Sequence, residues 1–217
     1  MDNTGTTDLE SFELGTPALV CRWRLANRHL PLENRHLRAL LARTVNGSRV
    51  TPELVAWAKQ HIEWTLEQGA AAHPDGTLML IVDTQGRAAM TVGPYAPLES
   101  ATTEALLTRA AQAHAEAAQT GVAPETLWAA CGDTLLWEPG AGCATSGAAS
   151  LVVQLAQTLG INVQVRDGLC DAIEGGALAC DELFLVSDEH GVVPASDAAG
   201  AYGSRLAQGY ERLLAQS

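Results

Sequence analysis

Lysine is nearly missing from this sequence: Lys59 is the only one among 217 residues. If this protein formed an imine through a side-chain amine, Lys59 would be the one candidate residue, because the second half of the chain contains no lysine. Basic residues number 13 against 25 acidic ones, which gives a net charge of −12. Because phosphate backbones are bound through clustered lysine and arginine, nucleic acid is not an expected partner.

Long apolar runs are also missing. No stretch reaches the roughly 18 apolar residues of a membrane span, so we expect no membrane partner. Residues 1–15 are polar and acidic, without the basic start and apolar stretch of a signal peptide. We therefore expect a disordered lead over residues 1–15 and a cytoplasmic location.

Cysteine is present, but without the spacing of a disulfide framework or a zinc knuckle. The five cysteines are odd in number, and no two of them form a CxxC pair. His29 and His36 could join an acid as metal ligands, but no metal-binding spacing accompanies them and a structural role is favoured. The sequence therefore predicts no metal.

What the chain does contain is enough apolar residues, 47%, for a sizeable core. Their spacing and the turn residues between them predict an α/β fold. The predicted strands cover 17–25, 77–82, 87–92, 126–130, 134–137, 162–166 and 182–186. The predicted helices cover 33–44, 52–68, 103–119, a segment between Gly147 and Gly160, and 203–215. Gly93–Pro97 has the composition of a linker, which predicts two domains, 1–97 and 98–217.

Four segments carry a resemblance to a known family. They are Leu25–Leu37, which contains a His-Leu pair, the hairpin Gly121–Trp137, the loop, helix and strand of Cys143–Asp167, and the strand and turn of Cys180–Pro194. In this order they resemble the class IV aminotransferases, the fold-type IV pyridoxal-phosphate enzymes, which include branched-chain aminotransferases and aminodeoxychorismate lyase. The resemblance implies two small α/β domains with an interdomain cleft, and a homodimer.

Carried over position by position, the resemblance leaves the family's cofactor site incomplete. The cofactor lysine falls on Thr102 or Thr103, and the phosphate-binding arginine falls on Ala39, next to Arg38. Neither threonine can form an imine. We therefore expect no cofactor, with pyridoxal phosphate no longer bound in the way the family binds it.

Other positions of the resemblance keep some capacity to bind an anion. Ser146 and Gly147 match the phosphate loop and open a helix, whose backbone N–H groups can hold an anion. The second hydroxyl-bearing turn falls on Ser187 and Asp188, where a carboxylate would repel a phosphate. Glu138 corresponds to the acid that pairs with the pyridine nitrogen.

Several side chains could supply other chemistry. His190 lies beside Asp188 in a turn and could act as a general base, or be an exposed turn residue. Cys143 precedes a helix, whose dipole can lower a thiol pKa, so it could be a nucleophile or an incidental cysteine. Arg22 and Arg24 share one face of a strand and could bind a substrate carboxylate or form ion pairs.

The leading hypothesis is a divergent class IV aminotransferase-like protein that has lost Schiff-base chemistry and binds a small anionic metabolite in the cleft. Its candidate catalytic residues are His190, Asp188 and Cys143, and its candidate binding residues are Arg22, Arg24, Arg38, Ser146, Gly147 and Ser187. One alternative is a pseudoenzyme that acts as a scaffold or regulatory partner. The other is an active, pyridoxal-phosphate-dependent aminotransferase or lyase.

Overall fold

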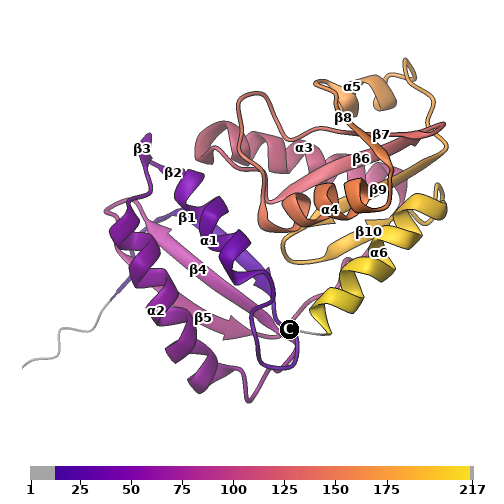
Figure 1. Ribbon diagram of the computed structural model, residues 1–217. Helices are drawn as coiled ribbons and strands as arrows, with labels where there is room; N and C mark the ends of the chain where they lie inside the picture. The colour runs from indigo at the N-terminus through magenta and orange to yellow at the C-terminus, as the bar shows by residue number, and fades with distance from the viewer. Residues whose placement is uncertain (1–12, 216–217) are drawn as a thin grey trace, which may run out of the picture.

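A computed structural model describes residues 13–215 of the chain. Two β-sheets of different size lie beside each other, each covered by helices (Figure 1). We expected disorder over residues 1–15, and residues 1–12 of that range lie outside the described part. None of the helices within 13–215 is long and apolar enough to cross a membrane.

The N-terminal half is a three-stranded antiparallel sheet in the order β1-β4-β5, covered on one face by two helices. Its strands are β1 (Pro17–Arg24), β4 (Thr77–Asp83) and β5 (Ala88–Gly93), its helices are α1 (Glu33–Ala42) and α2 (Pro52–Gly69), and β2 (Thr44–Val45) and β3 (Ser48–Arg49) form a short hairpin. Cys21 and Trp23 pack under the helices. Since side chains alternate along a strand, Arg22 and Arg24 lie on the other face, toward the second half.

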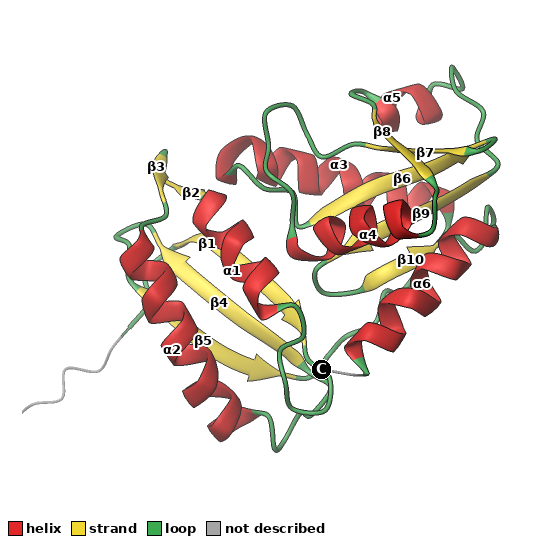
Figure 2. Cartoon of the chain, in the orientation of Figure 1, coloured by secondary structure: helices red, strands yellow, loops and turns green. Residues whose placement is uncertain are grey.

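The C-terminal half is a five-stranded sheet between two layers of helices (Figure 2). The strand order is β10-β9-β6-β7-β8, with only β7 and β8 parallel. The strands are β6 (Glu125–Cys131), β7 (Thr134–Trp137), β8 (Asn162–Val165), β9 (Glu182–Ser187) and β10 (Gly191–Pro194). Helices α3 (Thr103–Thr120) and α5 (Leu169–Glu174) cover one face, and α4 (Gly147–Thr158) and α6 (Ala201–Leu214) cover the other.

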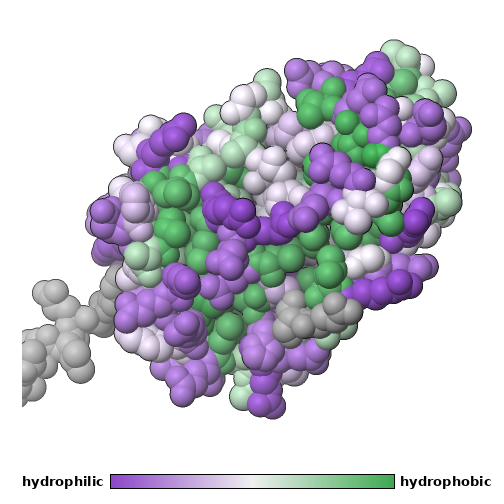
Figure 3. Space-filling view, in the orientation of Figure 1, coloured by the Kyte–Doolittle hydropathy of each residue, from purple (hydrophilic) through white to green (hydrophobic). Residues whose placement is uncertain are grey.

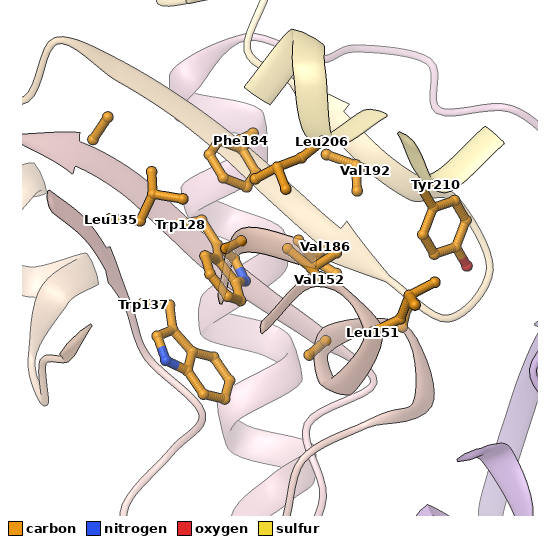
Figure 4. Packing of buried hydrophobic residues seen from close by; sticks show 14 of the residues in the cluster. Trp128, Leu135, Trp137, Leu151, Val152, Phe184, Val186, Val192, Leu206 and Tyr210 are labelled. Carbon is orange, nitrogen blue, oxygen red and sulfur yellow. The ribbon is translucent and has the colours of Figure 1, made fainter. Parts of the chain in front are cut away.

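The central strands β6 and β9 are buried on both faces, which explains the apolar runs at 127–130 and 183–186 within them. Leu127 and Leu185 pack toward α3 and α5, while Trp128 and Phe184 pack toward α4 and α6. The indole of Trp128 stacks on Trp137 at 5.0 Å and on Phe184 at 5.9 Å between ring centroids (Figure 4). These rings form the centre of the largest core cluster.

Polar contacts join the two halves. Arg35 of α1 donates to Ser150 of α4 at 2.9 Å and also contacts Gln154. Hydrophilic residues lie over α1 on this face of the molecule (Figure 3). The buried Arg43 donates to Glu116 of α3 at 3.1 Å. A polar junction of this kind can hold a small ligand between the halves.

The predicted elements match the observed ones to within about two residues wherever a helix or strand was expected. Four observed elements had no counterpart in the prediction: the β2–β3 hairpin, α5 and β10. Each is six residues or shorter, and so short a segment carries little periodicity. The domain boundary at residue 97 stays a prediction, and it falls between β5 and α3, where no helix or strand forms.

Candidate functional site

The turn after β9 forms hydrogen bonds that connect the second half of the molecule to the first. Its backbone is closed by Ser187, whose Oγ accepts the amides of Glu189 and His190 at 3.1 Å each. The carbonyl of Asp188 accepts the amide of Arg24 in β1 at 3.2 Å. The Glu189 carboxylate accepts the hydroxyl of Thr77 in β4 at 3.2 Å. The turn therefore lies at the junction of the two sheets.

Two pockets open at this junction and share Arg22, Arg109, Gln112 and Glu189. The smaller pocket has a volume of about 190 Å³, and its lining includes Ser187 and Asp188. The larger, of about 800 Å³, extends along the linker of residues 96–100 and the start of α3, and His190 lines it. We call the smaller one the junction pocket.

Four acids line the junction pocket, and each is already engaged with another group. Glu125 forms a two-bond ion pair with Arg109, at 2.7 and 2.9 Å. Glu116 accepts from Arg43, and Glu189 accepts from Thr77. The fourth, Asp188, points its Oδ1 at the amide of Ala148 at 2.8 Å.

Arg22 is the exception among the charged side chains that line this pocket. It is exposed and, within residues 13–215, has no hydrogen bond or salt bridge. Burial raises the pKa of Glu189, and the nearby Arg22 opposes this rise. The pocket therefore presents one uncommitted cation.

His190 lies beside the pocket with its side chain almost fully buried. Its Nδ1 is 3.1 Å from the hydroxyl of Tyr95, whose ring lies under the guanidinium of Arg24 at 3.3 Å. Burial lowers the pKa of His190 to about 4, assisted by nearby Arg109, Arg24 and Arg22 and opposed by Glu125. The imidazole is therefore neutral at pH 7 and offers one donor and one acceptor nitrogen.

This lowered pKa predicts a pH dependence of stability. The unfolded chain takes up the His190 proton near pH 6.5, before the folded chain does. The stabilisation is complete above about pH 6.5 and is lost as the pH falls toward about 4. Glu189, whose pKa is raised, contributes with the opposite sign.

Urea unfolding at several pH values measures this effect. His190→Gln should flatten the decline in unfolding free energy between pH 6.5 and 4. The exposed His29 provides the matched control, His29→Gln, which should leave the profile unchanged. Equal profiles for His190→Gln and the wild type would refute a lowered His190 pKa.

The N-terminus of α4 is occupied by groups of the protein itself. Ser146 caps the helix by accepting the amide of Ala149, and Asp188 accepts the amide of Ala148. The His36 ring lies against Gly147, where an added Cβ would collide with it. His36 Nδ1 is 3.7 Å from Asp188 Oδ1 and has no hydrogen bond within the described residues.

Besides Arg24, His190, Ser146 and Gly147, three more predicted site residues do not line the junction pocket. Arg38 is exposed, and its Nε donates to the carbonyl of Asn34 in its own helix at 2.9 Å. Cys143 packs near the Ala117 carbonyl, and burial raises the pKa of its thiol, the opposite of the lowering expected from a helix dipole. Glu138 accepts the amides of Gly168 and Cys170 near the start of α5.

Arg109 and Glu125, which no pattern in the sequence singled out, pair with each other in the lining of the same pocket. Arg109 is the only basic residue of the alanine-rich helix α3 apart from His114, and Glu125 begins a strand that is otherwise apolar. An isolated arginine and an isolated buried acid were the available signals.

The chain has the fold of the class IV aminotransferases and aminodeoxychorismate lyases, fold type IV. A hypothetical aminotransferase from Mycobacterium tuberculosis, in its PLP-bound form, matches with a TM-score of 0.64 at 14% identity, covering 96% of this chain and 95% of that one. A 4-amino-4-deoxychorismate lyase from Pseudomonas aeruginosa matches at 0.57 and 15%, covering 91% of each chain.

A third structure, the branched-chain amino acid aminotransferase from Escherichia coli, matches with a TM-score of 0.59 at 12% identity, covering 95% of this chain and 90% of that one. No family model and no curated protein sequence matches this chain. The relationship is therefore visible in the fold.

The comparisons overturn the expectation that no cofactor is involved. The Mycobacterium tuberculosis structure of this fold is described as PLP-bound, so pyridoxal phosphate is the cofactor that the fold implies. The expectation was wrong because it rested on a few residue positions matched by sequence alone.

The residues at the junction nevertheless do not fit this cofactor in the way the resemblance implies. Lys59 is on α2 and does not line the junction pocket or the larger pocket beside it. The Ala148 amide, where a phosphate would be expected, is taken by Asp188. The carboxylate of Glu138 is bound by two amides of the loop and helix at 168–170.

Proposed function

We propose that the protein binds a small anionic metabolite in the junction pocket, with Arg22 as the anchoring cation. The observation that carries this proposal is the charge balance of the pocket lining. Glu125, Glu116 and Asp188 are each engaged by another group, while Arg22 has no such partner in the described part of the chain. A guanidinium in this state can bind a carboxylate or a phosphate through two parallel hydrogen bonds.

The matched structures support a carboxylate-bearing or phosphate-bearing ligand. Two are named for an amino acid and for aminodeoxychorismate, both of which carry carboxylates, and a third is described as PLP-bound. Gln112 and the hydroxyl-bearing turn at Ser187 add polar groups to the same lining. His190, from the adjacent larger pocket, would meet the remainder of the ligand as a neutral imidazole.

Calorimetric titration with inorganic phosphate, succinate and pyridoxal phosphate tests the proposal. We expect at least one of these anions to bind the wild type, and Arg22→Gln to weaken that binding by at least about tenfold, the loss of one charge-assisted bond pair. Arg22 forms no hydrogen bond or salt bridge with the rest of residues 13–215, so the variant should remain as stable as the wild type.

Arg49 is the matched control, because it is also an exposed arginine of the N-terminal half and lies on β3, away from the pocket. Arg49→Gln should bind the same anion with unchanged affinity. The proposal fails if no anion binds the wild type, or if Arg22→Gln and the wild type have equal affinities. Absorbance spectra recorded with pyridoxal phosphate would also reveal an imine to Lys59.

A homodimer in the cytoplasm stays part of this proposal. Beyond the junction pocket, which Val20 lines, what supports the dimer is the remainder of the sheet face that α1 and α2 leave uncovered, where Met79 and Ile81 are only partly buried. Light scattering on the purified protein measures the mass, and a monomer would refute the dimer.

A further inference from the structure

A second group of reactive side chains lies away from the junction pocket, in the layer of α3 and α5. His114 comes from α3, Glu138 follows β7, and Cys170 comes from α5. One potential ligand atom of each lies within 4.8 Å of the other two. Imidazole, carboxylate and thiolate are the three side-chain types that bind Zn²⁺ in proteins.

The carboxylate at the centre of this group has no opposite charge beside it. Glu138 is only 9% exposed, and within residues 13–215 no arginine, lysine or histidine forms a salt bridge with it. Its oxygens accept the amides of Gly168 at 2.7 Å and Cys170 at 3.1 Å. Buried carboxylates are usually paired with a cation or bound to a metal, because desolvating a lone charge is costly.

The histidine of the group is held in one tautomer by a backbone carbonyl. Its Nε2 is 3.1 Å from the backbone carbonyl of Glu138. A carbonyl can only accept, so Nε2 carries the hydrogen and Nδ1 keeps the free lone pair in the neutral ring. Histidines that bind metals commonly donate their other ring N–H to a carbonyl or a carboxylate in this way.

The thiol of the group is buried close to this carboxylate, since Cys170 is only 8% exposed. A divalent metal would replace the thiol proton, which passes to solvent as the sulfur–metal bond forms. The bound ion would offset both the thiolate and the carboxylate.

We propose that His114, Glu138 and Cys170 bind a Zn²⁺ ion, with a water molecule as a fourth ligand. A thiolate and an imidazole select zinc over magnesium or calcium, which prefer oxygen ligands alone. Zinc bonds of about 2.0–2.3 Å require the three side chains to draw together slightly from their present spacing. The sequence predicted no metal, because these ligands are far apart in the chain and share no motif.

Titration of the chelator-treated, full-length protein with Zn²⁺ and with Co²⁺ tests this site. We expect one equivalent of Zn²⁺ to bind, and Co²⁺ to give a thiolate-to-metal charge-transfer band. Cys170→Ser should remove the band and weaken Zn²⁺ binding at least about tenfold. His114→Gln should weaken Zn²⁺ binding by a similar factor. His114 is partly exposed, so its variant keeps the test valid if Cys170→Ser fails to fold.

Cys143→Ser is the matched control, since this cysteine is also near α3 but lies outside the group. It should retain both the cobalt band and the zinc affinity of the wild type. The proposal is overturned if the wild type binds no Zn²⁺. It is also overturned if His114→Gln binds as tightly as the wild type, or if Cys143→Ser loses binding.

Discussion

Trp128→Ala is expected to lower the free energy of unfolding by about 3–5 kcal/mol, the usual cost of removing a fully buried aromatic side chain. Trp128 is 0% exposed on the central strand β6. Its ring stacks on Trp137 and Phe184, and its Nε1 donates to Thr126 at 3.0 Å. Alanine would leave a cavity between the sheet and α4.

Trp64→Ala is the matched control, because this tryptophan lies on α2 and is 50% exposed. Its loss should cost less than about 1 kcal/mol. Denaturant unfolding followed by circular dichroism measures both variants. Equal losses for Trp64→Ala and Trp128→Ala would show that the β6–β9 core does not dominate stability.

Asp188→Ala is expected to destabilise the protein by about 2–3 kcal/mol. Losing a hydrogen bond to a buried charged group costs about this much, because the partner of that group is left unpaired. The carboxylate is 3% exposed and accepts the amide of Ala148 at the start of α4. Its Oδ1 is also 3.7 Å from His36 Nδ1, in α1 of the other half. Removing it would leave the Ala148 amide without its acceptor and the His36 imidazole without a nearby carboxylate.

The matched control is Asp133→Ala, in the exposed β6–β7 turn, whose carboxylate accepts a hydrogen bond from the neighbouring Thr134 hydroxyl. That change should alter the unfolding free energy by no more than about 0.5 kcal/mol. Hydrogen exchange should also show faster exchange at the start of α4 in Asp188→Ala. Unchanged stability and exchange would contradict the role of Asp188 in joining the two halves.

Most of the fold could be predicted from the sequence, because its long elements carry strong local signals. Thr51 and Pro52 mark the start of α2, and the Thr51 hydroxyl accepts the amide of Leu54 as expected of a cap. The apolar run at 183–186 lies in a strand that is buried on both faces. The sheet order was not predicted, since strand pairing depends on contacts between distant residues.

The candidate site could be predicted only in part. The sequence pointed to the turn at Ser187–His190 and to Arg22, and the structure places them at one junction. It could not reveal that Asp188 occupies the end of α4, because that contact joins residues 40 positions apart. Nor could the sequence reveal the ion pair between Arg109 and Glu125. Because of this pair, Arg22 is the arginine of the pocket lining that has no ion-pair partner among residues 13–215.

The central claim is that a small anion binds at Arg22 in the junction pocket. The most direct measurement is a set of ¹H–¹⁵N spectra recorded while succinate or inorganic phosphate is added to the protein. We predict saturable shifts for the amides of Arg22, Gln112 and Glu189, and none for Lys59 on α2. Shifts centred elsewhere, or no shifts at saturating anion, would contradict the claim.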